Sequence, residues 1–337
     1  MQVLRTPDTC FQNLPGYPFA PHYTEVDDGE SGTLRIHHVD EGPSDAPTVV
    51  CLHGQPSWSY LYRRMIPVLV DAGLRVLAPD LVGYGRSDKP AAREDYSYQR
   101  QVDWMTSWLL ANDVKGATFF GQDWGGLIGL RMVAEHSDRF DRVVAANTGL
   151  PVPPDTPAEV IEEVHRFRAE APTPTLPEVM EAIGQSDRER FAVSFAYWQK
   201  WCWETEDLPV SMAIMGGTGG FALSPEEMAA YDAPFPDASF KMGPRAMPSH
   251  VPSLSDDPSV KANERAWQVF SKWEKPFLCA FSDNDPVTAG TERPFQERVP
   301  GAKNQRHVTL QGGGHFLQEA KGEELAEIVA EFVHSTP

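Results

Sequence analysis

Short apolar runs alternate with longer amphipathic stretches along most of the chain. The apolar runs have the length of buried strands and lie at residues 48–52, 75–78, 117–120, 143–146, 277–281 and 307–310. The amphipathic stretches predict helices at residues 60–71, 99–112, 127–136 and 323–334. This alternation is typical of βαβ units, so the sequence predicts an α/β fold with a mostly parallel central sheet flanked by helices.

This alternation stops after Pro151. From residue 151 to 237 the chain has no strand pattern, but proline-rich hinges enclose helix-favouring segments at 158–169 and 189–203. We therefore predict a helical cap domain, residues 151–237, inserted after the sixth strand. The core domain would consist of residues 1–150 and 238–337. The stretch 244–258, rich in proline and serine, is interpreted as a loop.

Composition narrows the class of protein. The chain has 337 residues, 41% of them hydrophobic, which is enough for a sizeable core. Its net charge of −19 argues against nucleic acid and anionic membranes as partners, because both require basic surface. No stretch of eighteen apolar residues exists, and the first residues lack the apolar run of a signal peptide.

The cysteines are few and scattered. Cys10, Cys51, Cys202 and Cys279 show no paired spacing, and two of them lie within predicted strands. Buried reduced thiols are therefore expected, rather than disulfides or zinc ligands. We expect a cytoplasmic protein that is a monomer or a weak oligomer.

The motif at residues 121–126, Gly-Gln-Asp-Trp-Gly-Gly, follows one predicted strand and precedes a predicted helix. In a nucleophile elbow, a strained turn between strand and helix raises the central side chain above the sheet, and here that side chain is Asp123. A carboxylate in this place can displace a leaving group from carbon and form a covalent ester that water hydrolyses. The alternative is that Asp123 merely caps the helix, but the strand before it and the helix after it favour the elbow.

Two downstream segments supply a possible acid and base, in the order that α/β-hydrolases use. Asp285 lies just past the predicted strand 277–281, with Asp283 as the alternative acid. His315 lies in a glycine-rich loop after the strand 307–310. With a carboxylate nucleophile, His315 would activate the water that attacks the ester, and Asp285 would orient the imidazole.

A further motif follows the first predicted strand. His-Gly-Gln-Pro at residues 53–56 resembles the oxyanion loop of α/β-hydrolases, in which a backbone N–H pairs with that of the residue after the nucleophile. The donors here would be the amides of Gln55 and Trp124. The segment 80–87 similarly resembles the loop after the next core strand of these enzymes.

Together, the motifs at residues 53–63, 80–87 and 122–126 resemble those of haloalkane dehalogenases, and the similarity extends from about Pro47 to the C-terminus. The resemblance implies hydrolysis of a small halogenated aliphatic substrate to an alcohol, a halide ion and a proton, through a covalent alkyl-aspartate ester. Water would be the second substrate. The resemblance implies no metal and no organic cofactor.

The resemblance also implies halide ligands. Trp124 matches one of them, and its indole N–H is a donor with no acceptor or titratable proton. Some members take the second ligand from an Asn after the oxyanion-loop His-Gly, where this chain has Gln55; others take it from a cap tryptophan. We therefore assign Trp198, with Trp201 and Trp203 as alternatives.

Members with the Asn often place the triad acid after the sixth strand, where residues 145–149 contain no carboxylate; this favours Asp285. Cap aromatics usually line the pocket in this family. Four residues are candidates for lining it: Phe195, Phe235, Pro236 and Val287.

Three alternatives have different activities. Epoxide hydrolases share the Asp nucleophile and use two cap tyrosines, for which Tyr197 and Tyr231 are possible, but they tend to have an aromatic residue and a His where this chain has Gln55 and Gln122. Fluoroacetate dehalogenases tend to carry Arg in place of Trp124. A non-catalytic receptor would usually have lost triad residues, and all three are present here.

Overall fold

The computed structural model describes residues 1–185 and 190–336. Within them, eight strands form the main sheet: β2 (His22–Asp27), β3 (Thr33–Glu41), β4 (Thr48–Leu52), β5 (Arg75–Pro79), β7 (Ala117–Gln122), β8 (Phe140–Ala146), β9 (Phe277–Ser282) and β10 (Val308–Leu310). Their spatial order is β10-β9-β8-β7-β4-β5-β3-β2. Only the pairs β2–β3 and β3–β5 are antiparallel, so the predicted mostly parallel sheet is confirmed.

The sequence analysis did not predict the first two strands of this sheet. Strand β2 is largely solvated, and it pairs with β3 at the edge of the sheet. A half-exposed edge strand has no continuous apolar run, which explains why it escaped detection. A separate two-stranded ribbon joins β1 (Val3–Leu4) to β6 (Lys89–Pro90).

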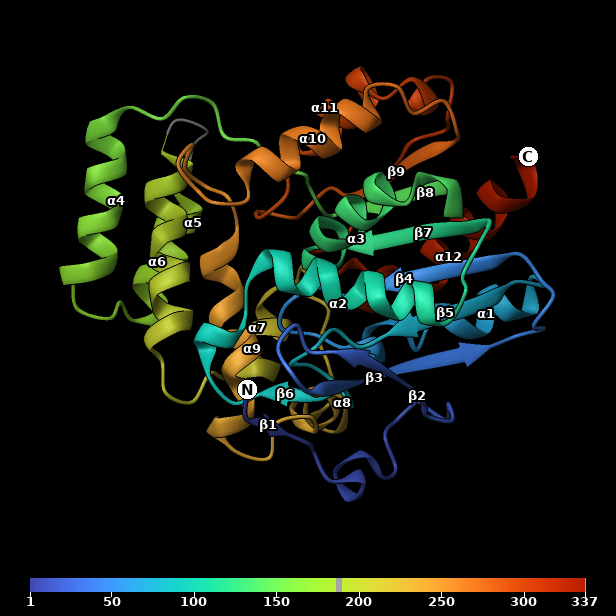
Figure 1. Ribbon diagram of the computed structural model, residues 1–337, viewed down its shortest axis with the longest axis horizontal. Helices are drawn as coiled ribbons and strands as arrows, with labels where there is room; N and C mark the ends of the chain where they lie inside the picture. The colour runs from blue at the N-terminus through green and yellow to red at the C-terminus, as the bar shows by residue number, and fades with distance from the viewer. Residues whose placement is uncertain (186–189, 337) are drawn as a thin grey trace.

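Helices cover both faces of the sheet (Figure 1). Helices α2 (Tyr98–Ala111), α3 (Trp124–Glu135) and α10 (Val260–Phe270) pack together on one face, and α1 (Met65–Asp71) packs with α12 (Leu317–Ser335) on the other. Helix α11 (Glu292–Arg298) follows β9. The predicted helices are present, although the stretch 60–71 begins as a 3-10 turn, η2 (Ser59–Tyr62), and α12 begins before residue 323.

One predicted loop is wrong in its first half. The stretch 244–258 contains most of α9 (Met242–Ala246) and the 3-10 turn η6 (Met247–His250). Pro244 and Pro248 lie in the first turns of these short elements, where the missing N–H costs no hydrogen bond. Proline content alone therefore misidentified these turns as a loop.

Between β8 and β9 the chain forms further helices at the carboxyl ends of the parallel strands (Figure 1): α4 (Ala158–Glu170), α5 (Leu176–Gly184), α6 (Phe191–Glu204), α7 (Val210–Gly216) and α8 (Pro225–Asp232). The described part of residues 151–237 contains no strand. The predicted helices 158–169 and 189–203 correspond to α4 and α6, although residue 189 lies outside the described residues. The boundaries of the cap domain stay a prediction.

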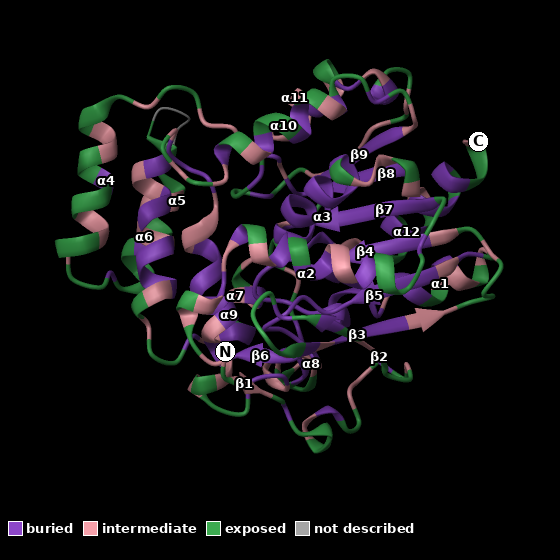
Figure 2. Cartoon of the chain, viewed as in Figure 1, coloured by how far each residue is buried: buried purple, intermediate pink, exposed green. Residues whose placement is uncertain are grey.

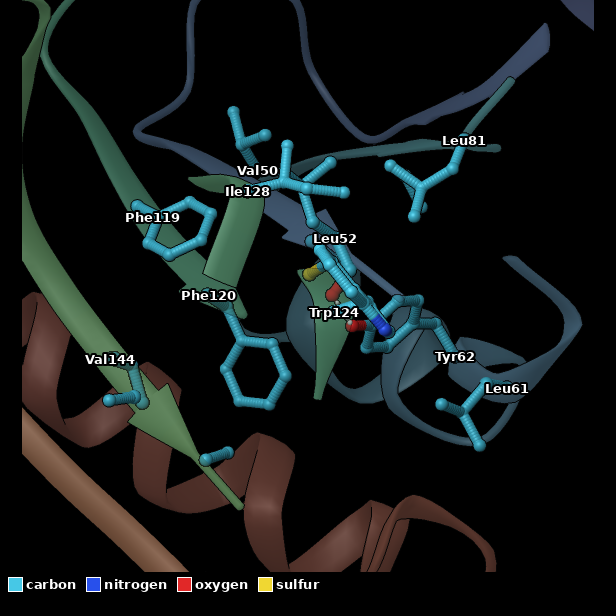
Figure 3. Close-up of a cluster of buried hydrophobic side chains, with 14 of the residues drawn as sticks. Val50, Leu52, Leu61, Tyr62, Leu81, Phe119, Phe120, Trp124, Ile128 and Val144 are labelled. Atoms are coloured by element: carbon cyan, nitrogen blue, oxygen red, sulfur yellow. Dashed lines mark hydrogen bonds between the residues drawn. The ribbon is translucent and has the colours of Figure 1, made fainter. Parts of the chain in front are cut away.

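The core lies between the sheet and its helices, as the buried strands in Figure 2 show. Figure 3 shows part of it, where side chains of β4, β7 and β8 meet Ile128 and Trp124 of α3. All four cysteines are free, as predicted, and only Cys10 is not fully buried. Among the described residues, no helix has both the length and the apolar character needed to cross a membrane.

Candidate active site

Asp123 lies at a strained turn between β7 and α3. Its backbone has φ of 50° and ψ of −128°, an uncommon combination for a residue with a side chain. Close packing requires glycine nearby: a Cβ atom at Gly125 would lie 2.0 Å from the carbonyl oxygen of Leu52, and one at Gly54 would lie 2.3 Å from the Cβ of Asp123. The geometry is that of the predicted elbow.

The Asp123 side chain does not cap α3, although the residue occupies the N-cap position. Its Oδ1 atom instead accepts a hydrogen bond from the backbone N–H of Gln55, at 2.7 Å. The amide of Trp124 belongs to the first turn of α3, where N–H groups have no partner within the helix. The Gln55 amide therefore contacts the carboxylate, and the role of the Trp124 amide stays a prediction.

His315 and Asp285 form a buried pair at the ends of two neighbouring strands. The Nδ1 atom of His315 lies 3.0 Å from Oδ2 and 3.1 Å from Oδ1 of Asp285. Asp285 also accepts hydrogen bonds from the Val287 amide, at 2.8 Å, and from the Thr288 hydroxyl. Although burial raises the pKa of Asp285, the facing imidazole and these hydrogen bonds hold it below its usual value.

The alternative acid is placed elsewhere. Asp283 is exposed, and its Oδ1 atom accepts a hydrogen bond from the Gly312 amide at 2.8 Å. This contact closes the loop that leads to His315, so Asp283 supports the loop while Asp285 contacts the ring.

The other ring nitrogen of His315 faces the elbow. Its Nε2 atom lies 3.3 Å from Oδ2 of Asp123. Burial lowers the pKa of His315, but the two carboxylates on either side outweigh burial and raise it to about 10. The structure thus brings together Asp123, His315 and Asp285, which lie far apart in the sequence.

Asn147 holds this arrangement together, and the sequence analysis missed it. Its side-chain N–H₂ donates to the carbonyl oxygens of Gly314 (2.8 Å) and His315 (3.1 Å), and its Oδ1 accepts from the Ser282 amide (2.9 Å). Its carbonyl accepts the Asp123 amide at 3.0 Å. The only available signal was its position just after the predicted strand 143–146.

Trp124 is buried at the start of α3. Its indole packs edge-on against Tyr98, with ring centroids 5.0 Å apart, and the Tyr98 hydroxyl donates to the carbonyl of Leu127 at 2.6 Å. These contacts fix the orientation of the ring beside Asp123.

The cap tryptophans lie on α6. The indole of Trp198 packs against that of Trp201, at 5.3 Å, in a cluster with Val179, Cys202 and Leu208. The described residues that contact the Trp198 ring in this cluster all come from the segment 151–237. The ring of Trp203 instead carries the Arg93 guanidinium, 4.6 Å from its centroid. Which of the three indoles faces the substrate stays a prediction.

The pocket candidates differ in exposure. Phe195 and Phe235 are buried, whereas Pro236 and Val287 are exposed. Phe195 stacks on Phe191 at 5.2 Å. Their role in lining a substrate pocket stays a prediction.

The tyrosines that an epoxide hydrolase would need are engaged in other contacts. Tyr231 is fully buried, and its hydroxyl donates to Glu319. Tyr197 stacks on Phe167 of α4 at 4.5 Å. The engaged hydroxyl of Tyr231 disfavours the epoxide hydrolase, which would need two tyrosine hydroxyls to donate to the substrate oxygen. The residues that the structure describes contain no group of three or more His, Cys, Asp or Glu side chains arranged to hold a metal ion.

The chain is similar to a protein family and to several known proteins. Residues 47–198 match the family model described as the alpha/beta hydrolase fold. The chain is 49% identical over 337 residues to a haloalkane dehalogenase of Psychrobacter cryohalolentis, covering 100% of both chains. It is 45% identical over 336 residues to haloalkane dehalogenase 1 of Mycobacterium tuberculosis, again covering 100% of both. The tetrameric structure of haloalkane dehalogenase DpaA from Paraglaciecola agarilytica NO2 is 31% identical, with a TM-score of 0.77 over 97% of each chain.

Proposed function

Since the chain belongs to the haloalkane dehalogenase family, we propose that Asp123, His315 and Asp285 carry out its hydrolytic dehalogenation through a covalent alkyl-aspartate ester. The observation that carries this proposal is the position of the Asp123 carboxylate. One of its oxygens accepts the Gln55 amide at 2.7 Å, and the other faces Nε2 of His315 at 3.3 Å.

In the first step, an oxygen of Asp123 attacks the carbon that bears the halogen. A carbon–oxygen bond forms, and the carbon–halogen bond breaks with its electron pair, which leaves as halide. The indole N–H of Trp124, buried beside the elbow, donates to the departing ion. Trp198 supplies the second donor in this proposal, with Trp201 and Trp203 as the alternatives.

In the second step, water attacks the carbonyl carbon of the ester while Nε2 of His315 takes a proton from it. The Gln55 and Trp124 amides hold the oxyanion that develops on the former carboxylate. Collapse of this intermediate releases the alcohol and restores the Asp123 carboxylate. Haloalkane and water thus yield alcohol, halide and one proton, and the balance requires no metal or organic cofactor.

The change in charge at Asp123 couples the two steps. While Asp123 is ionised, it and Asp285 hold the pKa of His315 at about 10, so the imidazole is protonated at neutral pH. Ester formation removes one of these charges, which lowers the pKa of His315 and favours release of its proton. His315 therefore becomes a neutral base after the ester has formed, which is the state that ester hydrolysis requires.

The proposal also includes the substrate class, the cap domain, the oligomeric state and the cellular location. The substrates are small halogenated aliphatic molecules, enclosed by a cap that comprises residues 151–237. The protein is a monomer or weak oligomer in the cytoplasm, a location that its four free cysteines support.

Halide release from 1,2-dibromoethane and 1-bromobutane tests the proposal, with styrene oxide consumption followed in parallel. We expect halide and acid from the bromoalkanes, no epoxide turnover, and loss of halide release in Asp123→Ala. Epoxide turnover without halide release would contradict the dehalogenase reaction and leave the three site residues in an epoxide hydrolase.

A further inference from the structure

Gln122 is the last residue of β7 and lies directly before the proposed nucleophile. Its side chain is fully buried. Its Nε2 atom lies 3.0 Å from the carbonyl oxygen of His315 and 3.4 Å from the Nε2 atom of the His315 ring. One amide group therefore contacts both the backbone and the ring of the proposed base.

The hydrogen-bonding partners of the Gln122 amide determine its orientation. A backbone carbonyl only accepts hydrogen bonds, so the part of Gln122 that faces the His315 carbonyl is its N–H₂ group. Rotating the amide would set its oxygen against the carbonyl oxygen. In the observed orientation, Oε1 is buried and has no hydrogen-bond partner among the described residues. An unpaired buried acceptor is unfavourable. The amide keeps this orientation because the contacts made by its N–H₂ group outweigh that cost.

The same N–H₂ group lies beside the ring nitrogen that has to take a proton from water. An N–H donor is compatible with Nε2 only when that nitrogen carries a lone pair. Asp285 meanwhile faces Nδ1 at 3.0 Å and holds the other proton there. We propose that Gln122 is a positioning residue for ester hydrolysis: once Asp123 is esterified, its amide keeps Nε2 of His315 as a hydrogen-bond acceptor. This inference rests on His315 being the base of the proposed function.

The two titratable groups that face the ring are Asp285, from the loop after β9, and Asp123, from the elbow. Uncharged groups also lie close to His315: Asn147 after β8, Phe316, and the segment around Thr218 after α7. Asp123 favours a proton on Nε2, and Gln122 opposes it. Once Asp123 is esterified, it carries no charge. Gln122 is then the polar side chain in contact with Nε2, and its N–H₂ group disfavours protonation of that nitrogen. Its influence therefore falls on the second step, in which water gives a proton to Nε2 as its oxygen bonds to the ester carbon.

The test separates the two chemical steps in the full-length enzyme. Gln122→Leu removes the donor at similar volume, and Gln122→His restores a ring N–H at the same place. Gln101→Leu is the matched control: Gln101 is equally buried, donates from Nε2 to the Val82 carbonyl at 2.7 Å, and likewise has an unpaired Oε1. Bromide release from 1,2-dibromoethane in the first turnover reports ester formation. Decay of the ester, followed by peptide mass after rapid quenching between pH 6 and 10, reports hydrolysis.

For Gln122→Leu we expect ester formation within about twofold of the wild type, and a pH profile of ester decay displaced upward by about one pH unit. The decay would be about tenfold slower near neutral pH and would recover at high pH, because a one-unit shift changes the fraction of neutral base tenfold. Gln122→His would restore the profile, and Gln101→Leu would leave it unchanged.

An unchanged profile in Gln122→Leu, or a loss equal at every pH, would overturn the inference, since the second result indicates only a structural role. ¹⁵N spectra of the His315 ring provide a readout independent of turnover: its titration should move upward in Gln122→Leu, and an unmoved titration would overturn the inference as well. An absence of ester in the wild type and in His315→Gln would instead contradict the proposed function itself. The two failures are thus distinguishable.

Discussion

The Nε2 atom of His315 lies 3.3 Å from the Oδ2 atom of Asp123, so the proposed base is in contact with the proposed nucleophile before any substrate binds. In most hydrolases with a serine at the elbow, such contact serves to deprotonate the nucleophile. A carboxylate needs no deprotonation at neutral pH. The contact is instead an ion pair that ester formation dissolves, and the consequences of this difference are open to experiment.

Loss of Asp285 should affect the second step more than the first. In Asp285→Asn the buried partner of Nδ1 is neutral, so the imidazole loses the group that holds its tautomer. We expect ester hydrolysis to fall by about 10³-fold or more, by analogy with the loss of a triad acid, while ester formation is reduced less. First-turnover halide release against steady-state turnover measures the two steps. Asp283→Asn, at the exposed loop contact, should preserve both.

The raised pKa of His315 predicts how stability depends on pH. Its pKa is about 10 in the folded protein and about 6.5 in the unfolded chain, so the proton binds the folded state more tightly. The stabilisation is fully present below pH 6.5 and is lost as pH rises toward 10. Urea unfolding measures the unfolding free energy of the wild type and of His315→Gln. The wild type should lose stability relative to the variant as pH rises over this range. A difference independent of pH would contradict the ion pair.

The cap halide ligand is tested by three substitutions. Trp198→Phe should weaken bromide binding and slow debromination, because it removes the indole N–H that we propose as a halide donor while the aromatic packing is largely kept. Trp201→Phe and Trp203→Phe are the matched controls on the same helix. Quenching of tryptophan fluorescence by bromide measures the affinity. If one of the controls loses affinity and Trp198→Phe does not, the assignment moves to that residue.

A buried ion pair joins the core to helix α12. Arg63 donates to both carboxylate oxygens of Glu319, at 2.5 and 2.7 Å, and both side chains are almost completely buried. Removing Arg63 leaves the buried Glu319 carboxylate with only the Tyr231 hydroxyl and the more distant Arg64, whose Nε atom lies 3.8 Å away. Arg63→Met should therefore cost about 3 kcal/mol of unfolding free energy. The exposed pair Arg306–Glu331 is the control, and Arg306→Ala should cost about 1 kcal/mol or less. Equal losses in urea unfolding would contradict this ranking.

Most of the sheet could be predicted because parallel strands are buried on both faces and therefore appear as continuous apolar runs. Strand β2 could not, since half of its residues are exposed and it carries no such run. The three proposed site residues could be selected from the sequence because each follows a strand, in an order that this fold constrains. The contacts of Asn147 and Gln122 were not predicted. Both side chains donate to the backbone of the loop 314–315, more than 160 residues away in the sequence, and no local pattern encodes such a contact.

The cap aromatics show a second limit. Helix α6 carries Phe191, Phe195 and three tryptophans among its fourteen residues, with apolar side chains on several faces. The period of an amphipathic helix identifies a buried face only when the opposite face is polar. Sequence reasoning therefore located the aromatic segment but could not decide which indole faces the substrate.

The measurement that bears most directly on the central claim is the peptide mass of His315→Gln after incubation with 1-bromobutane. The variant retains the Asp123 nucleophile but lacks the base for ester hydrolysis, so the covalent intermediate should accumulate. The account predicts one butyl group on the peptide that contains Asp123, with one equivalent of bromide released and no further turnover. An unmodified Asp123 peptide in a variant that continues to release bromide would contradict it.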